Sequence, residues 1–580
     1  MKKLMRGVGF TLTAAAGLML TALVVVGTSR AQTLPADAKT TCTVSAPVFK
    51  SWFALGSVSL NGVVNPANSV TFPNVPNCSF YQWSEQMFLW LLSPAPSAYG
   101  GGAHIFDSPA FYDVSPPDGS GNRTFIPHVP GKIRVFNLRD AKVGFHGLPV
   151  IFDKAGRMLE VERPKLGPTG RQLILNQSGQ QIEIGRVTLG PDKKPVFMDK
   201  AGKVIPKPQP IFRKELITGR AVQKVQKFMI DKIPVFLDPA GKVVDVEQGQ
   251  ADDGVLQAQN GSLVYYALMV NDVFAYFRTG AEDGGILPKP TKFPTTQADL
   301  NKIVAFASSH GKTFPDPNAL AIEVKSSWVE AAGLANLSSY VTMKATIPTY
   351  NKSNPDDWVV NGQKTVLLAL TGIHVVGSTA GHPEMIWATF EHFGNTPNAT
   401  YKYVDSSNAT KTVTSSTAGT WLFAASNSAA PFNVVHMQSG GTHILRVSPF
   451  HITPSNTMRM KVWGGGFDFS PNPLDASTAA SNSEIISINN SVRGQLAAGD
   501  VRANYFMIGS TWTIGGASPS GPFKSGAGNE VGTSQLANTT METYQQGGSN
   551  LWSAGANCFS CHGSNTTSVS HIYPFLKPLF

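Results

Sequence analysis

The stretch Thr365-Val-Leu-Leu-Ala-Leu-Thr-Gly-Ile-His-Val-Val376, followed by Met385-Ile-Trp-Ala-Thr-Phe-Glu-His392, decides the fold class. Both runs are rich in β-branched and aromatic residues, and clusters of Gly, Pro and Asn bound them, which is typical of strands. If the two runs pair as a hairpin, His374 and His392 lie on neighbouring strands, and Glu391 faces the opposite side from His392.

The remainder of the chain favours the same fold class. Apolar residues make up 42% of the sequence, enough for a core, whereas 14% charged residues with 55 Gly and 40 Pro favour a loop-rich, β-rich protein over a helical bundle. We therefore expect a β-rich α+β fold, with a β-sandwich-like or irregular β body and a few helices. Further strands are predicted over 321–328 and 504–513. Apolar periodicity predicts helices over 79–92, 263–277, 296–309, 483–496 and 535–546.

Residues 131–250 differ in kind because they contain an internal repeat. The pattern Pro-Val-(apolar)₂-Asp-(Lys or Pro)-Ala-Gly-(Lys or Arg) begins at Pro149, Pro195 and Pro234. Each copy has an apolar run, a turn that ends in glycine, and a second run, which is the signature of a β-hairpin. The uneven spacing of the copies predicts a small array of hairpins inserted into the body, not a regular solenoid.

This insertion also carries the basic character of the chain. It holds 22 Lys and Arg against 12 Asp and Glu, whereas the whole chain has 47 and 37. A concentrated positive charge can steer an acidic redox partner or contact an anionic surface, and a solvated module with incidental charge is the alternative. Aromatic residues are sparse here, which argues against a nucleic-acid partner.

The N-terminus has the features of a secretory signal peptide. Lys2, Lys3 and Arg6 precede an apolar run over 10–26, and Ser29-Arg30-Ala31 offers small residues for cleavage. A short membrane anchor is the alternative, but no later stretch is long and apolar enough to span a bilayer. We expect a periplasmic or secreted bacterial protein without a membrane span after cleavage.

Four cysteines fit an exported protein. Cys558-Phe559-Ser560-Cys561-His562 is the pattern for covalent haem attachment, in which two thiols bind the haem vinyl groups and the imidazole ligates iron. A zinc site would need two more ligands at similar spacing, and a redox pair would not require His562. Cys42 and Cys78 then remain as a pair, for which an oxidising compartment favours a disulfide.

The position of this motif restricts the architecture. Only eighteen residues follow His562, too few to enclose a haem, so the preceding body must supply most of the pocket. We expect five segments: a signal peptide (1–31), the N-terminal part of the body (32–130), the insertion (131–250), the β-rich main body (251–533) and a helical haem-attachment segment (534–580).

The motif, together with Asn504-Tyr-Phe-Met-Ile-Gly-Ser-Thr-Trp-Thr and Leu536-Ala-Asn-Thr-Thr-Met-Glu-Thr-Tyr-Gln, resembles a family of large exported bacterial proteins labelled cytochrome c family protein. The segments 323–328 and 383–392 are similar too. The resemblance covers the mature chain without the insertion and implies one haem c and redox activity. It implies no residue roles beyond Cys558, Cys561 and His562.

The sixth iron ligand would decide the function. A second strong ligand makes an electron carrier, and an open iron binds small molecules. The candidates are His571, Met541 and the group His374, His382 and His392, beside Glu384 and Glu391; that group also admits a separate metal site. Three hypotheses remain: a monohaem electron carrier with a redox partner protein, a haem-c oxidoreductase acting on peroxide, oxygen or another small molecule, and a binding module with a structural haem.

Overall fold

The computed structural model describes residues 33–73, 77–116, 122–136, 138, 150–152, 158–162, 164–190, 194–212, 223–230, 233–244, 254–281, 290–415, 417–440, 443–447, 450–460, 462–464, 476–519, 529–533, 536–546 and 558–580. The expected signal peptide lies outside these residues. Helices in the described part are α1 (Ala46–Trp52), α2 (Asn77–Leu91), α3 (Asp272–Gly280), α4 (Gln297–Ser309), α5 (Ala476–Arg493) and α6 (Cys558–Cys561).

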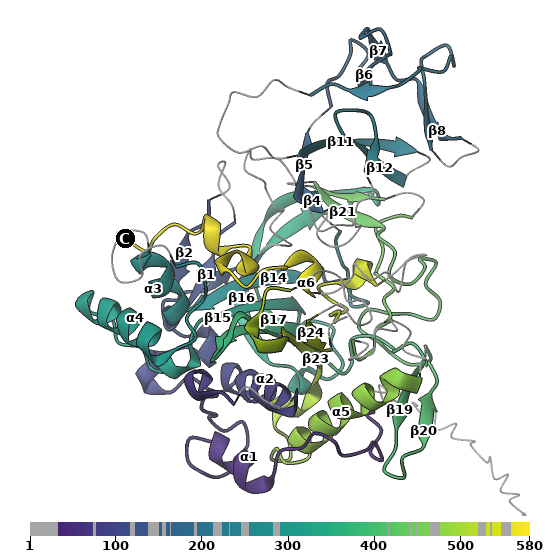
Figure 1. Ribbon diagram of the computed structural model, residues 1–580. Coiled ribbons are helices and arrows are strands. Elements are labelled where there is room, and N and C mark those ends of the chain that lie inside the picture. The colour runs from purple at the N-terminus through teal and green to yellow at the C-terminus, as the bar shows by residue number, and fades with distance from the viewer. Residues whose placement is uncertain are drawn as a thin grey trace, which may run out of the picture.

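A 12-stranded sheet organises the molecule (Figure 1). Its strands are β1 (Phe111–Val114), β2 (Phe125–Pro127), β3 (Arg134–Val135), β14 (Tyr265–Asn271), β15 (Ile322–Glu330), β16 (Thr342–Asn351), β17 (Asp357–Thr379), β18 (His382–His392), β21 (Met437–Gly440), β22 (His443–Arg446), β23 (Tyr505–Thr513) and β24 (Glu530–Gly532). The main path runs β2-β1-β14-β15-β17-β18-β23-β24, and all its pairs are antiparallel. A β-rich α+β fold is therefore confirmed.

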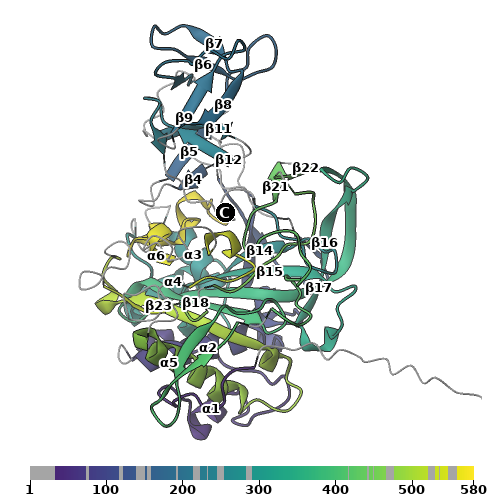
Figure 2. The ribbon, with the colours of Figure 1, turned by 90° about the vertical axis from the view of Figure 1, so that its right-hand side faces the viewer.

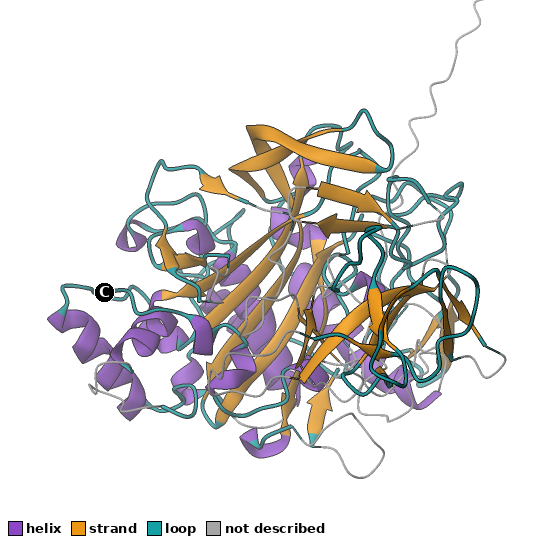
Figure 3. Cartoon of the chain, turned by 90° about the horizontal axis from the view of Figure 1, so that it is seen from above, coloured by secondary structure: helices purple, strands orange, loops and turns teal. Residues whose placement is uncertain are grey.

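The hairpin expected from 365–392 lies at the middle of this sheet. Strands β17 and β18 pair antiparallel, with His374 opposite Thr389 and Gly372 opposite Glu391. Strand β15 flanks β17 on the other side and places Lys325 opposite His374. Figure 3 shows the long strands of the sheet running side by side across the molecule. Because successive side chains alternate between faces, Trp387, Thr389 and Glu391 point to one face and Phe390 to the other.

One face of the sheet, here called the helical face, packs on α2 and α5. Phe88 of α2 stacks on Phe390 with ring centroids 4.2 Å apart, and Phe80 stacks on Trp512 at 4.0 Å. The apolar stripe that predicted this helix is buried, so ordinary core packing explains its aromatic residues. Helix α5, predicted over 483–496, packs against α2 and β23.

The opposite face, here called the C-terminal face, carries the last described residues of the chain. The yellow C-terminal segment lies above the sheet in Figures 1 and 2, and α1, α2 and α5 lie below it. The helix predicted over 263–277 is wrong in its first half, where β14 pairs between β1 and β15. The Asn271 side chain accepts a hydrogen bond from the Phe274 N–H at 3.0 Å and starts α3.

The residues described between 150 and 244, here called the hairpin module, form three small sheets above the body (Figure 2). One has the order β13-β12-β11-β5-β4, another β10-β6-β7, and the third pairs β8 with β9. Their bounds are β4 (Val150–Phe152), β5 (Met158–Glu162), β6 (Leu173–Leu175), β7 (Gln181–Glu183), β8 (Arg186–Leu189), β9 (Pro195–Met198), β10 (Gln209–Pro210), β11 (Gln223–Ile230), β12 (Ile233–Leu237) and β13 (Val243–Val244).

The repeats form turns of one kind. Asp199 Oδ1 accepts from the N–H groups of Ala201 and Lys203, both at 2.9 Å, and Gly202 takes a left-handed φ of 78°. Asp238 makes the same bonds in the third copy, and Gly241 also has φ 78°. The turn of the first copy lies outside the described residues. The same loop recurs at Asn176 and at Asp405, which begins the turn between β19 (Tyr401–Val404) and β20 (Thr410–Val413).

The first described residues of the range 131–250 pack with the body. Strand β3 pairs in parallel with β16, and Phe136 and Leu138 are buried in the main core. In the body, the disulfide predicted between Cys42 and Cys78 is confirmed, with Cα atoms 5.3 Å apart. Among the described residues, no helix has the length and apolar character needed to cross a membrane.

Candidate functional site

The attachment motif forms one helical turn on the C-terminal face. Helix α6 spans Cys558–Cys561, and the backbone N–H of His562 donates to the Cys558 carbonyl at 2.9 Å. This i to i+4 bond places Cys558 and His562 on one face of the turn. Cys558 is half-buried, and Phe559 is buried against the sheet. The motif thus presents a thiol and an imidazole side by side.

The imidazole of His562 has a fixed tautomer. Its Nδ1 lies 2.7 Å from the carbonyl oxygen of Val569, which can only accept a hydrogen bond. Nδ1 therefore carries the proton, and Nε2 carries the lone pair that a metal needs. Histidines that ligate metals are commonly oriented by such a bond from the other ring nitrogen to a carbonyl.

Aromatic rings fix the plane of this imidazole. Trp387 of β18 lies with its ring centroid 4.2 Å from that of His562, and His571 stacks on His562 at 4.0 Å. Trp387 is buried, and its indole N–H donates to the Glu384 carbonyl at 3.0 Å, so its own position is fixed. The central hairpin therefore directly orients the predicted iron ligand.

A buried carboxyl group supports the turn that holds Val569. The Ser570 hydroxyl, in the 3₁₀ turn Thr567–Ser570, donates to Glu323 Oε2 at 2.6 Å. Burial raises the pKa of Glu323 to about 7, although the Ser570 bond and the positive charges of Lys325 and Arg123 oppose that rise. Glu323 lies on β15, so the central sheet also fixes the acceptor of the His562 bond.

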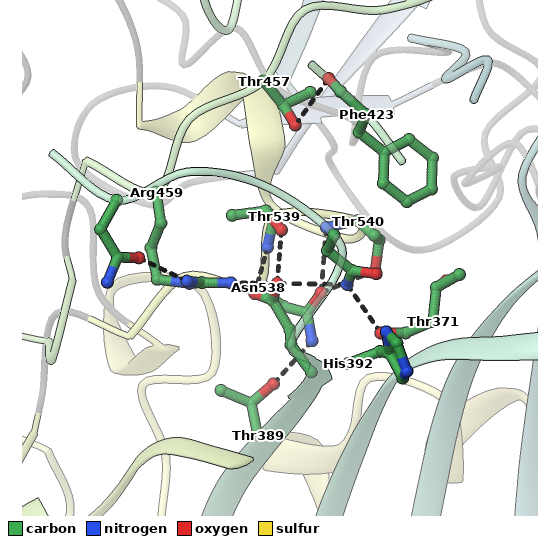
Figure 4. A network of polar contacts seen from close by, with 12 residues as sticks. Thr371, Thr389, His392, Phe423, Thr457, Arg459, Asn538, Thr539 and Thr540 are labelled. Carbon is green, nitrogen blue, oxygen red and sulfur yellow. Dashed lines mark hydrogen bonds and ion pairs between the residues drawn. The ribbon is translucent and has the colours of Figure 1, made fainter. Parts of the chain in front are cut away.

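The segment before the motif binds the C-terminal face through polar side chains. Glu391, at the end of β18, accepts from the Thr539 N–H at 2.6 Å and forms an ion pair with Arg459 at 2.5 Å. Asn538 donates to Thr389 at 2.9 Å. Figure 4 shows this network around Arg459, Asn538, Thr539 and Thr540. Glu391 and Arg459 are at most 1% exposed, so neither charge is solvated by bulk water.

A second pair of a carboxylate and a basic side chain lies further along the same face. Glu542 Oε1 is 2.9 Å from Nε2 of His374, and Glu542 Oε2 accepts from the Asn538 N–H at 2.9 Å. Burial raises the pKa of Glu542, but His374 and Lys325 more than offset it, so the pKa lies below its usual value. Glu542 is therefore ionised at neutral pH and holds the His374 ring.

The sixth-ligand candidates occupy different surroundings. His571 stacks on His562, Met541 is buried in the turn before Glu542, and His374 binds Glu542. His382 bonds Glu384 at 2.8 Å, and His392 stacks on Tyr340 with centroids 3.7 Å apart. Burial lowers the pKa of His392 to about 3. The 374–392 group is thus dispersed, and no cluster of three or more His, Cys, Asp or Glu side chains suited to a metal ion occurs in the described part of the chain.

The donor set fits a covalently bound haem with a histidine ligand. The fit rests on the half-buried Cys558 on the same helical face as His562, on the His562 tautomer, and on the apolar rings of Trp387 and Phe559 beside them. The side chain of Cys561, which carries the second thiol, lies outside the described part of the structure.

The sequence predicts Cys558, Cys561 and His562 as the attachment residues, but it did not predict the residues that contact His562. Val569 contacts His562 through its backbone carbonyl. Every residue type has this group, so the sequence gives no signal for it. Glu323 and Ser570 are 247 residues apart in sequence. One signal could have been used: Trp387, Thr389 and Glu391 alternate along the predicted strand 385–392, which would place them on one face. No protein-family model, curated protein or solved structure matches this chain.

Proposed function

We propose that this chain is an exported c-type cytochrome that transfers electrons through one haem. Cys558 and Cys561 bind the haem covalently and His562 is the proximal ligand. The observation that carries the proposal is the 2.7 Å bond from His562 Nδ1 to the Val569 carbonyl, because it gives the imidazole of a haem-attachment motif the tautomer that a metal ligand requires. The Cys42–Cys78 disulfide supports export to an oxidising compartment, periplasmic or secreted.

A bound haem supplies one-electron redox chemistry at iron. The chain supplies attachment and orientation: the α6 turn presents Cys558, and the Val569 carbonyl holds the proton on His562 Nδ1. Trp387 and His571 restrict rotation of the imidazole plane. The Glu391–Arg459 and Glu542–His374 pairs hold the preceding described segment on the sheet.

Intact mass tests the attachment. The protein is produced with a bacterial c-type cytochrome maturation system, denatured and extracted with acidified acetone. We expect the wild type to retain the mass of one haem, and the variant C558S/C561S to retain none while keeping its far-ultraviolet circular dichroism. A wild type whose haem is extracted, or that holds none, contradicts the proposal.

A haem-c oxidoreductase is the second candidate function. Two of the candidate sixth ligands already contact other side chains, because His571 stacks on His562 and His374 binds Glu542. This favours the oxidoreductase. An iron without a strong sixth ligand binds small molecules. Absorption spectra of the reduced protein with and without CO separate the two functions: a CO-induced change supports the oxidoreductase, and an unchanged six-coordinate spectrum supports the carrier.

A further inference from the structure

The hairpin module exposes charge of one sign. Between 158 and 244, the exposed charged residues in the described part are all basic, and they are Lys165, Arg171, Arg186, Lys194, Lys200, Lys203, Lys207 and Lys242. The described acidic residues of the same range are buried or half-buried. Among the described residues of the module, the positive excess is therefore larger at the surface than in the sequence count of the same residues.

The acidic residues of the module serve its internal structure. Asp199 and Asp238 accept backbone N–H groups within their turns, and Glu162 pairs with Lys224 at 3.2 Å. Glu183 pairs with Lys200 and accepts from the Thr169 N–H at 2.9 Å. The Lys200 and Thr169 bonds lower the pKa of Glu183 to about 2, so it remains ionised. These carboxylates keep their negative charge, but the described residues from 158 to 244 hold ten basic and five acidic side chains, so a positive excess remains.

Exposed apolar side chains accompany the basic ones. Leu166, Val204 and Val243 are 57%, 52% and 37% exposed, and each directly follows an exposed lysine. Val204 and Val243 occupy the same position in the second and third repeats. Protein interfaces combine such apolar contacts with a charged rim. Residues 131–250 contain no Trp or Tyr, the residues that anchor proteins at a membrane interface or stack on nucleic-acid bases.

The module lies on the same side of the sheet as the attachment motif. In Figures 1 and 2, which differ by 90°, the strands β4 and β5 at its base lie next to the yellow C-terminal segment, and α1 lies at the far end of the molecule. A protein docked on the module would therefore lie on the same side of the sheet as the segment that carries His562.

We propose that the hairpin module docks an acidic, one-electron-carrying protein next to the haem. Electrostatic attraction to the exposed lysines raises the rate of encounter, and the adjoining aliphatic side chains supply the apolar contact. In the complex one electron passes between the partner's redox centre and the haem iron, so one centre is oxidised as the other is reduced. The transfer step rests on the proposed function, whereas the docking step does not.

Charge reversal of the haem-loaded protein tests the docking. The variant R186E/K203E/K242E retains the turns, because Lys203 and Lys242 serve them through backbone N–H groups. The probes are poly-L-glutamate for binding and a reduced acidic flavodoxin for electron transfer. At an ionic strength of about 0.01 M, where the Debye length is about 30 Å, we expect the variant to bind and react at least roughly tenfold more weakly than wild type, with a flatter salt dependence.

The control K39E/K50E/K302E reverses three exposed lysines of the body and should behave as wild type. Equal losses in both variants, or no loss in either, overturn the docking site. Binding to phosphatidylglycerol vesicles but not to poly-L-glutamate also overturns it in favour of a membrane surface. A normal haem spectrum with no poly-L-glutamate binding refutes the docking alone, and binding without haem refutes the cytochrome function alone.

Discussion

At the residue scale, the position of the His562 ring is set by groups that no motif specifies. The sequence predicts His562 as an iron ligand, because Cys-x-x-Cys-His has a chemical reason for its spacing. It did not predict the Val569 carbonyl, the Trp387 ring or the His571 stack, because these depend on how the 3₁₀ turn and β18 approach α6.

The stacking of His571 on His562 predicts that His571 is not the second iron ligand. Two axial ligands bind iron from opposite faces of the haem, whereas rings stacked at 4.0 Å lie on the same side. His571 has a left-handed φ of 51°, which Asn tolerates well. We expect H571N to bind haem with the same oxidised and reduced absorption spectra as wild type. A change from six- to five-coordinate spectra would identify His571 as the sixth ligand after rearrangement.

The raised pKa of Glu323 predicts that the free energy of unfolding depends on pH. Its pKa is about 7 in the folded protein and about 4.3 in an unfolded chain. At pH values below the pKa of the unfolded chain, Glu323 is neutral in both states, and its buried carboxyl makes its full contribution to the free energy of unfolding. As pH rises from about 4.3 to 7, only the unfolded chain ionises, so the wild type loses about 3 kcal/mol relative to E323Q. Urea unfolding of both proteins between pH 4 and 8 measures this difference, and parallel pH profiles would refute it.

At the scale of helices and strands, long segments with apolar periodicity were predictable from the sequence, whereas short polar segments were not. The helices α2, α4 and α5 and the strand β23 lie where apolar periodicity placed them. The helix expected over 535–546 is wrong in its described part, which is a turn followed by the 3₁₀ helix Thr543–Gln545. Side chains of Asn538, Thr539 and Thr540 bond to the sheet and to nearby backbone, and this competes with helix formation.

The Glu391–Arg459 pair fixes this turn on the sheet. Removing one partner leaves the other charge buried, which destabilises a protein by about 3–5 kcal/mol. We expect R459M to lose that amount in urea unfolding, and R459M/E391Q to recover part of it. The matched control is R446M, because Arg446 pairs with Asp356 at 3.2 Å on the surface, where we expect a loss below about 1 kcal/mol. Equal losses in R459M and R446M would refute the buried role.

The disulfide stabilises the N-terminal element of the helical face. It closes a loop with a sequence separation of 36 residues between α2 and the chain before α1. On the chain-entropy model we expect C42S/C78S to lose about 3–4 kcal/mol in urea unfolding. Because the disulfide is on the face opposite α6, haem attachment should persist. A variant as stable as wild type, or one without haem, would contradict this assignment.

At the scale of the whole molecule, the two faces of the sheet pack against different parts of the chain. Its helical face packs on α2 and α5, and its C-terminal face holds the attachment motif through Trp387, Glu323 and Glu391. Which face of the sheet holds the motif was not predictable from the sequence, because it depends on hydrogen-bonded pairs separated by 148 and 247 residues.

The pyridine haemochrome spectrum of the purified protein, recorded after co-production with a c-type maturation system, reports covalent haem attachment directly. We expect a haemochrome of the c type, at one haem per chain, that is absent from C558S/C561S. A protein that yields no haem, or a haemochrome of the non-covalent b type, would contradict this expectation.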